Sequence, residues 1–448
     1  MFEVSRFPCF PHLFPYSFFL FVSAQTILAQ PRVMTFDEAV RIAVERNERA
    51  AIATATVDAA QARVAIARSS FFPMVSLTGT YNRRPFESVR IVGDDRITIQ
   101  SYHAFAATAN VSVPLIAPSL FANLSVSRAE RNAITVESRN DIRRLAFETA
   151  SAFLEALGTA EVAAASERRL DFARQNLDAS RARFDAQLVG RNDLTRAELE
   201  YATAEREHTN ARSAHETAMF RLAFLLGGQR PDSLVVPSAL LTEAVGFRPD
   251  EEELIHRAES CRPDLRAKTE HAAALGFATT AAMLGALPTL SAIGQYRLTN
   301  ESGFSGRTWN WFVGASLNWN ILDGGLWLAQ REERDALHRV AEWELSQARR
   351  GISLEIRSAV TALENARAAL KQAEVALEAA RRNAEETREL YRQGLIDAVT
   401  AADANVRLYE ADVARTRQRY ALASALLNVY DTTGLDPFGQ DIDSEAGR

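Results

Sequence analysis

The alternation that decides the fold occupies residues 309–321, which have the sequence WNWFVGASLNWNI. Every second position from Trp309 onward is apolar, and the positions between are Asn, Gly or Ser apart from Phe312. Such a strand presents one apolar and one polar face. With Trp309, Trp311 and Trp319 toward its ends, it is typical of a transmembrane barrel strand with tryptophans at the membrane interfaces. A half-buried strand in a soluble sandwich would show the same alternation.

Residues 105–113 repeat this alternation more weakly. The expected strands are 74–83, 102–114, 289–298 and 309–321, forming two β-hairpins at 74–114 and 289–321. Each strand is long enough to cross a bilayer when tilted. Lipid tolerates no open sheet edge and the smallest barrels have eight strands, so four strands cannot close a barrel alone. Membrane insertion therefore requires several chains to share one barrel, and three chains would supply twelve strands.

The chain is a tandem repeat of one structural unit. PMVSLTGTY at 73–81 recurs as PTLSAIGQY at 288–296, and the capping box that begins at Thr35 recurs at the same offset at Asp250. The offset is smaller farther along the chain, where Gly227 matches Gly434. The first unit must therefore contain one longer connection, located between its two strands.

The first structural repeat is expected to span residues 34–227 and the second 250–434. Helices are predicted at 35–72, 119–186 and 194–226 in the first repeat, and at 251–286, 325–391 and 401–432 in the second. Residues 228–249 contain three prolines and are predicted to be a linker, and polar residues 435–448 a flexible tail.

The long helix 325–391 would extend about 100 Å at 1.5 Å per residue, so it needs neighbours along its length. Heptad spacing from Ile352 to Tyr391 gives an unbroken seam of large and small residues, and Leu145 to Phe184 gives its counterpart. The small residues permit close helix approach. The helices alone would also suit a soluble coiled-coil scaffold.

The N-terminus differs from the remainder of the chain. Residues 1–29 contain an aromatic-rich apolar run followed by small residues, as in a signal peptide, with possible cleavage before Gln25 or Gln30. Removal of this segment would leave Cys261 as the single cysteine, so no intramolecular disulfide is expected. We therefore expect an exported protein without disulfide cross-links.

Composition and motifs exclude several function classes. The 448 residues carry 51 Lys+Arg and 57 Asp+Glu, a net charge of −6, which does not favour nucleic acid binding. No run of eighteen apolar residues follows the N-terminus, which excludes a helical membrane channel. No nucleophile elbow or phosphate loop is present, so no enzyme activity, cofactor or metal site is expected. His208 and His215 share a helix face and are interpreted as surface residues.

The chain resembles the TolC family of outer-membrane efflux and export duct proteins over about 34–434. The resemblance rests on the repeat, the proline-led motif at both first strands, and three shorter motifs: RPDL at 262–265, NILDGG at 320–325 and LLG at 225–227. It departs from the family pattern at Asn47, which stands where the second repeat has Arg262, and at Gln187, which stands in place of Gly394.

The resemblance implies a mainly α protein with a membrane β part. Long coiled-coil-like helices and two β-hairpins would trimerise into a 12-strand β-barrel and an α-helical periplasmic tunnel. The implied location is the cell outer membrane, extending into the periplasm. The implied partners of this homotrimer are outer-membrane lipid, a periplasmic adaptor (membrane fusion) protein and an inner-membrane transporter. The implied function is a passive duct in tripartite efflux or type I secretion. The alternative, a soluble periplasmic coiled-coil adaptor, predicts one helical hairpin and no aromatic lipid-facing strand.

The resemblance also implies where the closed pore narrows. Family members often carry two acidic residues three apart that ring the pore, and the matching positions here are Thr400 and Asp403. Asp193 is the first-repeat counterpart of Thr400. Asp397 precedes Thr400 in the second turn. Three copies of Asp403 at a narrow mouth would favour cations. These aspartates would equally suit helix caps or solvated positions.

The two helix–helix turns at the periplasmic tip are the candidate adaptor contacts. Their residues are Leu188, Val189, Gly190, Gly394 and Leu395. The corresponding candidates for contact with lipid are Trp309, Trp311 and Trp319.

Overall fold

The computed structural model describes residues 33–301 and 307–440. The predicted signal peptide lies outside the described residues, as do the last eight residues of the predicted tail. The first unit contains α1 (Phe36–Arg46), α2 (Glu48–Ser69), β2 (Met74–Arg83), β3 (Ser88–Val92), β4 (Asp95–Gln100), β5 (His103–Ile116), α3 (Pro118–Asp185) and α4 (Arg191–Leu225). The second contains α6 (Glu251–Cys261), α7 (Pro263–Leu284), β7 (Thr289–Thr299), β8 (Trp309–Asn318), α8 (Leu326–Arg392) and α9 (Ala398–Thr433). Three short elements, β1 (Val33–Met34), β6 (Ser233–Leu234) and α5 (Ser238–Gly246), lie before and between them.

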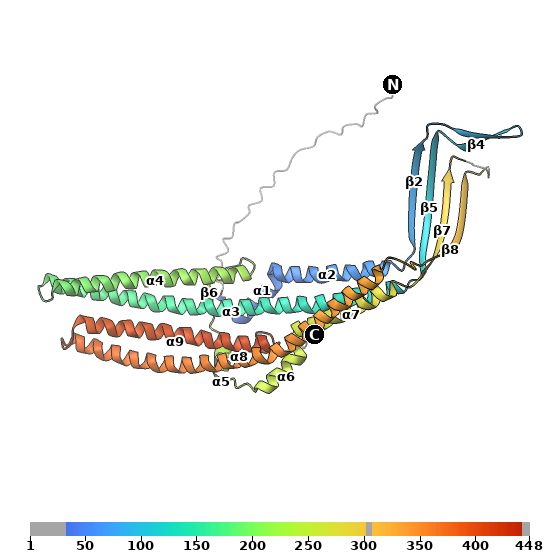
Figure 1. Ribbon diagram of the computed structural model, residues 1–448. Coiled ribbons are helices and arrows are strands. Elements are labelled where there is room, and N and C mark those ends of the chain that lie inside the picture. Colours follow the sequence, from blue (N-terminus) through green and yellow to red (C-terminus); the bar gives the residue numbers. More distant parts are fainter. Residues whose placement is uncertain (1–32, 302–306, 441–448) are drawn as a thin grey trace, which may run out of the picture.

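The protein is an elongated helical body with a β-sheet at one end (Figure 1). The long helices α3 and α8 run through it, and the turns that follow them form the opposite end. Near the sheet the helices are ordered α2, α3, α7, α8, and toward the tip they are ordered α4, α3, α9, α8. The helical layer therefore has two lateral edges, one formed by α2 and α4 and the other by α8.

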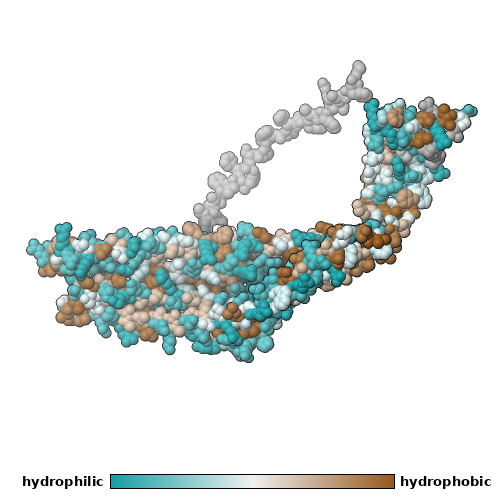
Figure 2. All heavy atoms as spheres, in the orientation of Figure 1, coloured by the Kyte–Doolittle hydropathy of each residue, from teal (hydrophilic) through white to brown (hydrophobic). Residues whose placement is uncertain are grey.

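The predicted heptad seams lie inside this layer. Along α8, Ile352, Ile356 and Leu363 are buried, and the seam continues through Leu370 and Leu377. Every predicted seam position of α3 and α8 is buried or half-buried. The seams are thus confirmed as contacts between helices, and the outer helix surface is largely hydrophilic (Figure 2).

The sheet has the strand order β2-β5-β7-β8, and all of its neighbours are antiparallel. The four strands begin and end within a few residues of their predicted bounds. The first unit also contains the β3–β4 hairpin, inserted between β2 and β5, and this insertion is the longer connection expected from the change in repeat offset.

Each helix predicted before the sheet is in fact two helices, so the continuous helices 35–72 and 251–286 are wrong. Asn47 separates α1 from α2, and its side-chain oxygen accepts a hydrogen bond from the Arg49 amide, so it caps α2. Arg262 separates α6 from α7 and has an extended backbone because Pro263 follows it.

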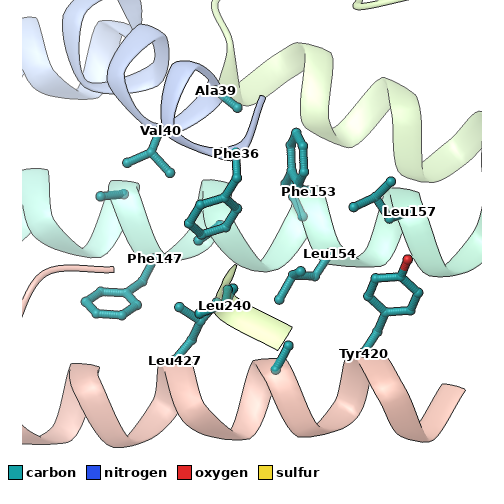
Figure 3. Close-up of a cluster of buried hydrophobic side chains, with 14 of the residues drawn as sticks. Phe36, Ala39, Val40, Phe147, Phe153, Leu154, Leu157, Leu240, Tyr420 and Leu427 are labelled. Atoms are coloured by element: carbon teal, nitrogen blue, oxygen red, sulfur yellow. The ribbon is translucent and has the colours of Figure 1, made fainter. Parts of the chain in front are cut away.

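The two predicted connecting segments are also partly structured. Residues 228–249, expected to be a linker, include strand β6, which pairs in parallel with β1, and helix α5, whose Leu240 is buried against α9 (Figure 3). The predicted tail begins with Leu435, which is buried, and Phe438, whose ring meets Phe36 edge to face at 5.9 Å. Arg143 of α3 fixes this segment by donating to the carbonyl of Leu435 at 3.4 Å. Both segments fold because they cover the apolar core at the middle of the helical body.

Candidate channel wall and periplasmic tip

One face of the sheet is apolar across all four strands. The paired backbone positions align Leu77 with Ala109, Ala109 with Tyr296, and Tyr296 with Trp311. The complete face is Val75, Leu77, Gly79, Tyr81, Phe105, Ala107, Ala109, Val111, Val113, Leu290, Ala292, Gly294, Tyr296, Leu298, Trp309, Trp311, Val313, Ala315 and Leu317. Side chains of this face are exposed at all its large residues along β8, including Trp311 at 64%.

The aromatic residues of this face gather at the outer end of the sheet, away from the helices. Tyr81 lies against Phe105 with ring centroids 4.9 Å apart, and Tyr296 stacks on Trp309 at 6.5 Å. Trp319 follows β8 at the other end, where its indole nitrogen donates to the Ala286 carbonyl at 3.2 Å. The tryptophans therefore lie toward the two ends of the sheet, and tryptophan is enriched at the two interfaces of membrane-spanning segments.

The opposite face of the sheet is polar. Gln295 of β7 donates to Asn110 of β5 at 2.8 Å, and Thr108 and Asn310 lie in register on either side of Arg297. Within the described part of the chain, β2 and β8 each pair on one side only. The sheet thus combines an apolar surface, a polar surface and two open edges.

The tip of the helical body, at the end opposite the sheet, consists of two turns of the same design. After α3, the Leu188 amide donates to the Arg183 carbonyl at 2.9 Å, and after α8 the Leu395 amide donates to the Leu390 carbonyl at 3.0 Å. This six-residue closure requires a left-handed residue just before its donor. Gly394 supplies it with φ 75°, and in the first turn Gln187 adopts φ 62°. Gln187 is therefore a strained counterpart of a glycine.

The candidate adaptor residues lie on these turns. Leu188 is 75% exposed and Leu395 is 67% exposed, so two large apolar side chains project from the tip. Gly190 is the residue before α4, and Val189 and Gly394 complete the turns. Exposed apolar residues at a helical tip are a candidate protein contact.

The structure brings two of the four candidate pore residues together. Asp193 of α4 and Asp403 of α9 line one groove of about 250 Å³ between the two helical hairpins, which Arg196 also lines. Asp403 accepts a hydrogen bond from Arg407 on its own helix at 2.8 Å. Its negative charge is therefore partly balanced within α9.

The other two candidates form a helix cap. Asp397 precedes α9 and accepts from the Thr400 amide at 2.9 Å and from the Thr400 hydroxyl at 2.6 Å. These hydrogen bonds lower the pKa of Asp397, and the positive charge of Arg196 lowers it further. Asp397 and Thr400 thus order the turn that precedes the groove.

A buried arginine above the groove was not predicted from the sequence. Arg169 of α3 is paired with Glu200 at 2.9 Å and with Glu207, both on α4, and it covers the Tyr409 ring of α9 at 5.0 Å. Burial lowers the pKa of Arg169, but the hydrogen bonds and charges of the two glutamates outweigh burial and raise it overall. The seven-residue spacing of the glutamates was the available signal, because it places both on one helix face.

The two histidines of α4 lie between helices, so their interpretation as surface residues is wrong. His208 is 3.2 Å from the Ser166 hydroxyl, and His215 is 3.4 Å from the Thr159 hydroxyl. Both histidines are half-buried in the α3–α4 seam. Over the described ranges, no cluster of three or more His, Cys, Asp or Glu is arranged to hold a metal ion. None of the helices in those ranges is long and apolar enough to span a membrane.

Comparisons with known proteins find one relative by sequence and several solved structures with the same fold. Nodulation protein T of Rhizobium leguminosarum bv. trifolii is 24% identical over 401 residues, covering 85% of this chain and 82% of that protein. The Campylobacter jejuni CmeC outer membrane channel has a TM-score of 0.76 at 16% identity, covering 89% of this chain and 85% of that one. The open state of the Neisseria gonorrhoeae MtrE outer membrane channel has a TM-score of 0.72 at 18% identity, covering 90% and 89%.

The family assignment follows from both halves of the chain. The family model named outer membrane efflux protein matches residues 39–228 and 254–435, so each structural unit is covered. The resemblance inferred from the sequence motifs is thereby confirmed. The chain belongs to the outer membrane efflux protein family, and it is an outer-membrane channel component of tripartite efflux or secretion systems that extends into the periplasm.

Proposed function

We propose that three copies of this chain form one duct whose outer part is a twelve-strand barrel. The open edges of the four-stranded sheet are the observation that carries this proposal. An apolar face in lipid requires that every edge be closed, because an unpaired backbone group in hydrocarbon costs several kcal/mol. Strand β2 runs toward the outer end and β8 runs away from it, so β8 of one copy would join β2 of the next as an antiparallel pair.

The helical layer supports the same arrangement. Its lateral edges carry exposed apolar side chains: on α8 these include Trp343 and Leu354, on α2 Ile66, and on α4 Phe224. In the trimer, α8 of each copy would lie against α2 and α4 of its neighbour. The helices would then form a tunnel that continues the barrel. Trp309, Trp311 and Trp319 would contact lipid at the barrel's ends.

The tip would connect the duct to the inner membrane. Leu188, Val189, Gly190, Gly394 and Leu395 would dock on a periplasmic adaptor protein, which in turn joins an inner-membrane transporter. Transport through this chain would be passive, without catalysis, and the transporter would supply the energy. The cargo would be selected by that transporter and not by this chain.

Asp403 and Asp193 would line the closed end of the duct, with Asp397 and Thr400 ordering the turn beside them. Three copies of the groove would place six aspartates around the mouth, and Arg407 would moderate their field. Acidic rings of this kind favour cations over anions.

The trimer is tested by cysteine cross-linking in the outer membrane, with the native cysteine replaced. Cysteine at Thr78 of β2 is combined in turn with cysteine at Asn310, Gly314 or Asn318 of β8, all on the polar face. At least one pair should yield a covalent trimer on oxidation. Cysteine at Thr108 of β5 is the matched control, because β5 is paired on both sides within its own chain. A soluble periplasmic monomer would refute the duct and favour the coiled-coil adaptor.

The mouth is tested by single-channel recording in planar bilayers at low salt. Asp403→Asn should reduce the preference for cations, and Arg407→Gln should increase it, because the two changes shift the local charge in opposite directions. Glu410→Gln, also on α9 and exposed, is the charge-matched control. If ion selectivity is unchanged in both Asp403→Asn and Arg407→Gln, Asp403 does not line the constriction.

A further inference from the structure

The apolar face of the sheet ends in cationic residues at its outer end. Arg83 is the last residue of β2 and pairs with His103, two positions beyond the aromatic pair Tyr81 and Phe105. Because side chains alternate along a strand, Arg83 and His103 share the face of these rings. Contacts agree, since the Tyr81 hydroxyl lies 2.9 Å from His103 Nδ1 and the two rings stack.

The other edge of the sheet has the same combination. Arg307 precedes β8 by two residues, and its guanidinium lies 5.8 Å from the centre of the Trp309 ring. A cation above an indole face is a favourable contact. Trp309 also stacks on Tyr296, so the arginine lies at the outer limit of the aromatic band. Both edges of the sheet therefore end in an arginine next to aromatic rings.

Within one chain Arg83 ends the first strand of the sheet and Arg307 precedes the last strand, so three strand spacings of 4.7–4.9 Å, about 14 Å, separate them across the sheet. In the proposed trimer, β8 of one copy lies next to β2 of the following copy. That pairing would place Arg307 of one copy and Arg83 of the next at the outer end of the same subunit boundary. The pair is complete only at a subunit boundary, and the trimer has three such boundaries.

We propose that the outer end of each subunit boundary binds the phosphate group of an outer-leaflet lipid. This inference rests on the proposed trimer. Arg83 of one chain and Arg307 of the next hold the phosphate, since guanidinium groups bind phosphate oxygens with two parallel hydrogen bonds. The lipid's acyl chains lie along the apolar face below, across the aromatic band. The positive charges at the outer end and the apolar face below them therefore match a lipid whose phosphorylated headgroup lies above its hydrocarbon chains.

The sheet provides a matched control in Arg297 of β7. This arginine lies near the same outer end, but it pairs in register with Asn310 and Thr108 and so belongs to the polar face. Removing its charge changes the net charge of the outer end by the same amount as removing that of Arg83. A lipid on the apolar face should depend on Arg83 and not on Arg297.

The test is native mass spectrometry of the full-length protein in a neutral detergent, titrated with lipid A, a diphosphorylated glycolipid. The expected result is up to three bound molecules per trimer, with about fivefold weaker binding in Arg83→Gln or Arg307→Gln for each cation removed at the membrane surface. Arg297→Gln should bind as the unmodified protein does, and dephosphorylated lipid A should not bind specifically.

Equal weakening by Arg297→Gln, or unchanged binding in the Arg83→Gln, Arg307→Gln double variant, would overturn the site. Displacement of the lipid by millimolar inorganic phosphate would overturn its assignment to a lipid, since the acyl chains would then contribute nothing. The same spectra report the oligomeric state. A trimer without the expected lipid dependence refutes only this inference, whereas a monomer refutes the proposed duct.

Discussion

Replacing the glycine in the second tip turn should loosen that turn without disturbing the rest of the duct. Gly394 has φ 75°, in the left-handed region, and a Cβ added there would meet no heavy atom within 4 Å. Gly394→Ala therefore introduces backbone strain and no clash. The first turn contains the converse case, because Gln187 already occupies the same conformation at φ 62°.

The size of the effect follows from the backbone alone. A non-glycine residue in the left-handed region costs about 1 kcal/mol after allowance for the smaller entropy of the unfolded chain. Gly394→Ala should thus increase local opening of the second turn about fivefold. Gln187→Gly should reduce opening of the first turn by a similar factor. Gly190→Ala is the control, since Gly190 has an ordinary extended backbone at φ −79° and equally open surroundings.

Hydrogen–deuterium exchange measures both turns in one experiment. The reporters are the amides of Leu395 and Leu188, each of which donates the closing hydrogen bond of its turn. Protection at Leu395 should fall in Gly394→Ala, and protection at Leu188 should rise in Gln187→Gly. If Gln187→Gly lowers protection, the glutamine side chain stabilises the turn by a contact of its own, and the strain argument fails.

Three further changes test the helix junctions and the α9 cap. Gly434→Ala should destabilise the protein by about 3 kcal/mol in urea titration, because φ 83° is combined with a Cβ only 3.1 Å from the Arg262 backbone. Asn47→Ala should lower the free energy of unfolding by about 2 kcal/mol in the same assay, because the Asn47 amide donates to the buried Leu225 carbonyl at 2.9 Å and its side-chain oxygen caps α2. Asn47→Asp keeps only the cap and should recover part of this loss. The lowered pKa of Asp397 means that its cap is fully present above the ordinary aspartate pKa and is lost as the pH falls through the lower pKa of the folded state. Hydrogen exchange in the first turn of α9 should therefore increase at acidic pH in the unmodified protein. Asp397→Asn should show no such step.

Periodicity was sufficient to predict the strands and the long helices. The β8 pattern fixes which face is apolar, and the register of its neighbours extends that face over all four strands. The heptad from Ile352 likewise predicts the buried side of α8. These elements are regular over many residues, so local sequence determines them.

The features missed from sequence depend on contacts between distant residues. The break at Asn47 is stabilised by a hydrogen bond to a residue 178 positions away, and no local pattern shows this. Leu435 is buried by α3 and α9, although it stands in a polar segment. At the tip, the pairing of Asp403 with Arg407 was available from their four-residue spacing, whereas the contact of Arg169 with the Tyr409 ring of α9 was not.

The junctions at Asn47 and Arg262 explain why the missed elements gather at one level of the molecule. In each unit one long helix is continuous, and two shorter helices lie end to end along it. These are α2 and α4 along α3 in the first unit, and α7 and α9 along α8 in the second. In both units a side chain at the start of one of these helices donates a hydrogen bond to a carbonyl near the end of the other. Asn47 donates to the Leu225 carbonyl, and Arg262 donates to the Thr432 carbonyl at 3.4 Å.

An interrupted helix leaves an end whose carbonyls and apolar side chains must be covered. Gly227 lies against Arg46 and Gly434 against Arg262, so in each unit the chain passes close to the break. The segments that cover these breaks are α1, α5 and the residues after Gly434, each of which contributes buried positions to the central core. The corrections to the predicted linker and tail therefore have one cause. Where two helices meet end to end along a long helix, their exposed ends must be covered, and the linker and the start of the tail fold over them.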